Sequence, residues 1–123
     1  TLRCSWGGPD IGAVAGIALM PSTTQQTYIS DYTEYGKSVK RVFGTNDGLG
    51  SGVLSMKTCP HKFLGLKYDE TDLRGSVSSN PTEQAYYHIF LGSLASSAVS
   101  DLKIEVDIEY LVQFFEPKVL VES

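Results

Sequence analysis

Three carboxylates lie within four residues of one another, at Asp69, Glu70 and Asp72. Several oxygen ligands gathered in one place are what a calcium ion requires. Their spacing differs from that of an EF-hand loop, and Arg74 follows closely enough to pair with one carboxylate. The sequence leaves a calcium site and a solvated loop open here, and it favours the solvated loop.

Three further carboxylates, Glu105, Asp107 and Glu109, alternate along a strand-like segment near the end of the chain. Alternate strand residues share one face and are about 7 Å apart. Carboxyl groups roughly 5 to 10 Å apart can hydrolyse a glycosidic bond. Nothing in the sequence indicates that one of these carboxyl groups is buried. We therefore expect them to have a structural role, on a face that meets water or basic residues of another copy.

The sequence gives little support for nucleophilic catalysis. Cys59 and His61 are two positions apart, but a Cys–His nucleophile depends on pairing in space and not on sequence adjacency. With Cys4 and His88 they show no zinc-ligand spacing, and we expect both cysteines to be buried, unreactive thiols. The sequence has no G-x-S-x-G elbow and no phosphate-binding loop. We therefore predict no enzyme, and no catalytic, cofactor-binding or metal site.

The charge of the chain is unevenly placed. Residues 1–36 carry a net charge of −2, residues 37–67 carry +5 and residues 68–123 carry −7, giving −4 overall. Phosphate contacts need clustered Lys and Arg, so an acidic chain is a poor nucleic-acid binder by itself. Two interpretations remain open: solvated faces of one domain, or basic and acidic surfaces that join separate copies.

The segments that carry these residues are mostly strands. Residues 102–115 alternate apolar and acidic positions, which predicts one strand of roughly 46 Å whose far half is covered on both sides. A short helix is the best prediction for residues 27–37, and glycine- and serine-rich joints occupy 46–52, 74–81 and 92–100. Further strands are predicted at 12–20, 38–45, 53–58, 63–68 and 85–91.

The aromatic strand at 85–91 has two faces. One face carries Tyr86, His88 and Phe90, and the other carries Tyr87, Ile89 and Leu91. We expect the second face to be core. The first face would contact another copy of the chain or stack on nucleic-acid bases, and subunit contact is favoured because few cations flank it.

Six strands with long joints predict an all-β domain over residues 1–123, built as a sandwich whose strands cross between two sheets. The immunoglobulin pattern of Cys, Trp and Cys on successive core strands is absent, since Trp6 lies beside Cys4 and Cys59 precedes a proline. A jelly-roll β-sandwich is therefore the leading architecture.

Residues 67–118 resemble the shell domain of small icosahedral virus coat proteins of the sobemovirus, tombusvirus and nodavirus kind. The order of segments carries the resemblance: an acidic joint at 68–74, a Gly/Ser loop at 75–81, an aromatic strand at 86–91, and a final alternating strand that ends near Pro117. The resemblance can be extended back to Gly12. It implies a jelly-roll shell domain that lacks its first one or two strands, as the C-terminal larger part of a longer chain.

The same resemblance implies a structural capsid protein that self-assembles into an icosahedral shell enclosing a viral genome. Its location would be the virion. Its partners would be copies of itself, and the genome mainly through a basic segment outside this chain, with no membrane. No cofactor is implied except Ca²⁺ between subunits. The alternative from another class is a small β-sandwich recognition module, lectin-like or receptor-binding.

Overall fold

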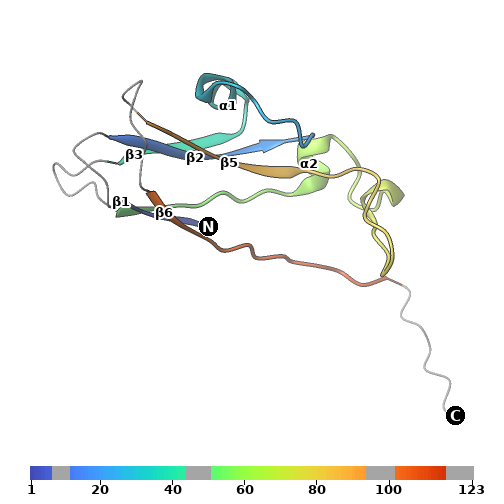
Figure 1. Cartoon of the computed structure of the whole chain (residues 1–123). Helices are drawn as coiled ribbons and strands as arrows, with labels where there is room; N and C mark the ends of the chain where they lie inside the picture. Colours follow the sequence, from blue (N-terminus) through green and yellow to red (C-terminus); the bar gives the residue numbers. More distant parts are fainter. Residues whose placement is uncertain (7–11, 44–50, 94–101, 116–123) are drawn as a thin grey trace, which may run out of the picture.

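The computed structural model describes residues 1–6, 12–43, 51–93 and 102–115. Within these residues, six strands form two antiparallel sheets that face each other (Figure 1). The first sheet has the order β4-β1-β6, with β1 at Leu2–Trp6, β4 at Ser51–Leu54 and β6 at Leu102–Val106. The second has the order β3-β2-β5, with β2 at Ala13–Met20, β3 at Ser38–Phe43 and β5 at Tyr86–Ser93. The predicted all-β class is confirmed.

Within the described residues, the strands are joined by short helical segments: α1 at Ile29–Glu34, α2 at Pro60–Leu64 and the 3-10 turn η2 at Thr71–Leu73. The helix predicted within 27–37 is α1, and the strands predicted at 12–20, 38–45 and 85–91 are β2, β3 and β5. No helix in the described part of the chain is long and apolar enough to cross a membrane.

The strand predicted at 63–68 is wrong, because residues there begin in α2. Pro60 occupies the first turn, where its missing N–H costs no hydrogen bond. Gly65 then ends the helix with a φ of 72°, the left-handed conformation that glycine adopts without strain. The strand predicted at 53–58 overlaps β4 only at Val53 and Leu54, because β4 begins at Ser51 and ends at Leu54, so the prediction is wrong for residues 55–58.

The single long strand predicted over 102–115 is also wrong, because β6 ends at Val106. Next to its end, the amino and carbonyl groups of Thr1 bond to the backbone of Asp107 at 2.7 and 2.8 Å. Residues 107–115 continue in an extended path that pairs with none of the described strands (Figure 1). Leu111 there is fully exposed, so the expected cover on both sides is absent from the described chain.

Two clusters of buried side chains hold the layers together. The first lies between the sheets, and its members alternate along four strands: Leu2, Cys4, Ala13, Ala15, Ile17, Phe43 and Leu54. The second lies between the outer face of the β3-β2-β5 sheet and α1, and it consists of Ala18, Met20, Tyr32 and Phe90. The joints predicted at 46–52 and 92–100, and Pro117, lie wholly or mostly outside the described residues.

Candidate functional site

The inter-sheet space is closed along β3 and β4 and open along β5 and β6. On the open side, Tyr87, Ile89 and Leu91 of β5 are 40%, 38% and 45% exposed. The cross-strand pairs Leu2–Val106 and Cys4–Ile104 direct the apolar side chains of β6 into the same space, yet Ile104 and Val106 are also exposed. We define the open side as the inward-pointing side chains of β5 and β6, together with Ile108.

A groove of about 110 Å³ runs into the open side. Its lining comes from both sheets, including Ile17 and Ile89 from one and Leu2 and Val106 from the other. Burial raises the pKa of the Tyr87 phenol, and the nearby Tyr110 and Cys59 raise it further. Asp107 and Glu109 also line the groove, and the apolar part of its lining is suited to holding apolar side chains.

The two faces of β5 are reversed relative to the prediction. Phe90, expected on a contact face, is buried and stacks on Tyr32 of α1 with ring centroids 5.2 Å apart. The face with Ile89, expected to be core, is the exposed one. The prediction was wrong because α1 covers the outer face of β5, whereas no described strand covers the inner face.

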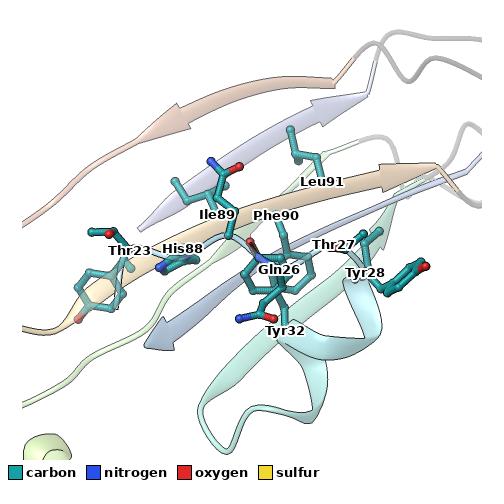
Figure 2. A pocket seen from close by; sticks show the side chains of 12 residues that line it. Thr23, Gln26, Thr27, Tyr28, Tyr32, His88, Ile89, Phe90 and Leu91 are labelled. Carbon is teal, nitrogen blue, oxygen red and sulfur yellow. Dashed lines mark hydrogen bonds between the residues drawn. The ribbon is translucent and has the colours of Figure 1, made fainter. Parts of the chain in front are cut away.

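A second hollow, of about 440 Å³, lies beside β5 on the α1 side (Figure 2). The segment before α1 forms one wall, with Gln26 and the exposed Tyr28, and β5 forms the other. His88 bonds through Nε2 to the carbonyl of Ser22 at 2.7 Å, which fixes this segment against the strand. Amide, hydroxyl and aromatic groups line the hollow.

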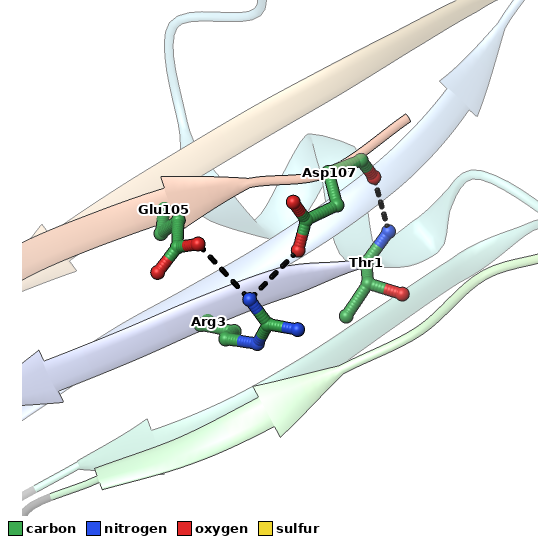
Figure 3. Close-up of polar contacts among 4 residues, drawn as sticks. All are labelled: Thr1, Arg3, Glu105 and Asp107. Atoms are coloured by element: carbon green, nitrogen blue, oxygen red, sulfur yellow. Dashed lines mark hydrogen bonds and ion pairs between the residues drawn. The ribbon is translucent and has the colours of Figure 1, made fainter. Parts of the chain in front are cut away.

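The acidic face predicted on residues 105–109 forms ion pairs within the chain (Figure 3). Nη1 of Arg3 lies 3.0 Å from Oε1 of Glu105 and 3.0 Å from Oδ2 of Asp107. All three side chains are at least half exposed. Arg3 therefore neutralises part of the face that we expected to meet basic residues of another copy, and Glu109 takes no part in these pairs.

Asp69, Glu70 and Asp72 lie in and before η2, in an exposed or half-exposed segment. The guanidinium of Arg74 donates to the backbone carbonyl of Asp69 at 3.0 Å. Among the described residues, no three His, Cys, Asp or Glu side chains are placed to hold a metal ion.

The cysteines are free and differ in environment. Cys4 is buried between the sheets, where burial raises the pKa of its thiol. Cys59 is exposed just before α2, so the prediction of a buried thiol is confirmed for Cys4 and wrong for Cys59. His61 contacts Tyr68 edge to face at 5.3 Å, and not a cysteine.

Comparison with protein-family models, with curated proteins and with solved structures finds no match to this chain. The features that sequence reasoning missed are β1, the Arg3 pairs and the open side. A signal for β1 exists, because Leu2 and Cys4 alternate with Arg3 and Ser5. Nothing in the sequence indicates that β1 pairs with β6, about one hundred residues later.

Proposed function

We propose that this chain is a jelly-roll coat protein whose copies assemble into an icosahedral shell around a viral genome. The pattern of strand pairing carries the proposal. A jelly roll is an eight-stranded antiparallel ribbon, rolled up so that the first strand pairs with the eighth, the second with the seventh, the third with the sixth and the fourth with the fifth. Rolling also places the third beside the eighth and the fourth beside the seventh.

If β1 to β6 are numbered as the third to the eighth strand, every observed pair fits this scheme. The pairs β1–β4 and β2–β3 are then ribbon pairs, and β1–β6 and β2–β5 are the pairs made by rolling. The first and second strands would pair with β6 and β5, the two strands that border the open side. This agreement supports a jelly roll of which the chain is the C-terminal larger part.

Assembly would draw on contacts between copies and on no chemical step. Isologous and heterologous contacts repeated by symmetry supply the free energy of such shells. For contacts between copies, the described surface offers opposite charges. Lys40 and Arg41 are exposed on β3, and Glu109 is exposed beyond β6. With a net charge of −4, the chain would leave genome binding mainly to a basic segment outside it.

The test is negative-stain electron microscopy with light scattering on the full-length protein. We expect uniform closed shells at neutral pH, and a single monomer or trimer across pH and salt would overturn the proposal. Glu109→Lys reverses a charge without disturbing the Arg3 pairs and should reduce shell yield at low salt. Glu83→Lys, an exposed acidic residue on the segment before β5, is the matched control and should assemble normally.

The hollow beside β5 favours one second candidate, a recognition module. Its Gln26, Tyr28 and His88 offer amide, aromatic and imidazole groups of the kind that bind sugars and peptides. A protein that stays monomeric and binds immobilised oligosaccharides, with binding lost in Tyr28→Ala, would favour this candidate over a coat protein.

A further inference from the structure

The surface around α2 carries lysines that are not paired with carboxylates. Nζ of Lys37 lies 5.9 Å from the centre of the Phe63 ring in α2, and Lys62 is the residue before Phe63 in the same helix. Both lysines are exposed. The ion pairs within the described residues are those of Arg3 in the other sheet, so no neighbouring carboxylate neutralises either lysine.

The chain that follows α2 turns back and adds a third lysine and an aromatic ring to this surface. Gly65 ends the helix, and the N–H of Leu66 donates to the carbonyl of His61 at 2.8 Å. The rings of Tyr68 and His61 then meet edge to face, with centroids 5.3 Å apart. Lys67, between Leu66 and Tyr68, is exposed and forms no ion pair with a described residue. We define the α2 surface as Lys37, Lys62, Lys67 and Tyr68.

The Tyr68 ring is held in place and yet is 66% exposed. Its hydroxyl donates to Oε1 of Gln113 at 2.8 Å, and its ring contacts His61. A ring that is already fixed loses little freedom when a flat group stacks on it. Nucleic-acid bases are flat groups of this kind. Proteins that bind single strands combine cations for the phosphates with exposed aromatic rings for the bases.

We propose that the α2 surface binds single-stranded nucleic acid, with the lysines on the phosphates and Tyr68 stacked on a base. An acidic protein segment would satisfy the lysines too, but it offers no flat partner to the Tyr68 ring, and nucleic acid is favoured for that reason. Glu34, Asp69 and Glu70 are close to these residues in the sequence and repel phosphates. We therefore expect a modest dissociation constant, on the order of 10 μM at low salt.

The proposal deepens the coat-protein proposal and rests on it only for the identity of the nucleic acid, which would be the genome. It gives the chain a share of genome binding despite its net charge of −4. None of the residues of the α2 surface lines the groove or the hollow, so the proposal does not depend on what covers the open side. Shells are detected by microscopy and binding by titration, so a failure of one proposal is distinguishable from a failure of the other.

Fluorescence anisotropy of a labelled oligo(dT) of about 12 nucleotides, titrated with the 123-residue chain, tests the proposal. We expect saturable binding, and a plot of log affinity against log salt with a slope of about −2 for three lysine contacts. Lys62→Glu should weaken binding by about tenfold or more. The matched control Lys103→Glu makes the same change of net charge at an exposed position of β6, and it should weaken binding by less than about twofold. Circular dichroism verifies that both variants fold.

Tyr68 and Lys62 should differ in how they change the salt dependence. Tyr68→Leu should lower the affinity by about fivefold or more and leave the slope unchanged, because it removes stacking and no charge. Lys62→Gln should make the slope less steep by about 0.7, because it removes one phosphate contact. A structural role of either residue would not produce this difference in slope.

Three results would overturn the proposal. The first is an oligo(dT) titration that shows no binding at low salt. The second is an equal loss of affinity in Lys62→Glu and Lys103→Glu, because net charge alone would then explain the binding. The third is an unchanged affinity in Tyr68→Leu. If the chain instead associates with itself at low salt and Lys62→Glu prevents this, the partner of the lysines is an acidic surface of another copy.

Discussion

The closed and open sides of the sandwich follow the same alternation of apolar residues but differ in what covers them. On the closed side, Phe43 of β3 and Leu54 of β4 point inward and are buried. On the open side, Ile89 of β5 and Val106 of β6 also point inward and keep more than a third of their surface exposed. Alternation therefore fixes the direction of a side chain, and the facing strand decides whether it is buried.

The largest expected effect contrasts these two sides directly. Phe43→Ala removes a fully buried ring and leaves a cavity, which should lower the free energy of unfolding by about 3–5 kcal/mol. Ile89→Ala removes a side chain that is already partly in water, and it should cost about 1 kcal/mol or less. Urea unfolding measures both free energies.

Equal losses of stability in Phe43→Ala and Ile89→Ala would contradict the difference between the closed and open sides. A large loss of stability for Ile89→Ala would mean that the open side is covered in solution. A small loss for Phe43→Ala would mean that the two sheets pack loosely along β3 and β4.

β5 shows how far sequence reasoning reaches. Its strand character and its two faces were predictable from alternation, because Tyr87, Ile89 and Leu91 recur at every second position. Which face is core was not predictable, because both faces carry aromatic or aliphatic residues. The choice depends on α1 lying over Phe90, a contact between segments that are far apart in the sequence.

The same limit applies to the candidate site. The acidic residues of 105–109 could be found from their spacing, but their partner Arg3 lies at the other end of the chain. Pairing over such a separation depends on strand order, which a single sequence does not encode locally. The strand prediction at 63–68 failed for a local reason, since Pro60 and Gly65 are start and stop signals of a short helix.

A second prediction sharpens the comparison within β5, whose outer face is closed. Gly16 pairs with Phe90 across the sheet, and a Cβ at Gly16 would overlap the Phe90 ring. Because that ring is held against Tyr32, Gly16→Ala should cost about 1–3 kcal/mol of stability through overpacking. Thermal and urea unfolding measure the loss.

Gly36→Ala is the matched control, since a Cβ there meets no atom within 4 Å. It should change stability by roughly 0.5 kcal/mol or less. If the two alanine variants are equally stable, the outer face of β5 is not tightly packed and the distinction between its faces is lost.

The smallest expected effect concerns Arg3, which links β1 to β6 on the outer face of the β4-β1-β6 sheet. Its two ion pairs are exposed, so Arg3→Met should cost at most about 1 kcal/mol, most of it screened away in roughly 1 M salt. Lys103→Met is the control, because it removes a positive charge from the same face of the β4-β1-β6 sheet without breaking either pair. A loss for Arg3→Met that is several times larger, or that salt does not reduce, would mean that these pairs are buried in solution. The outer face of the β4-β1-β6 sheet would then be covered.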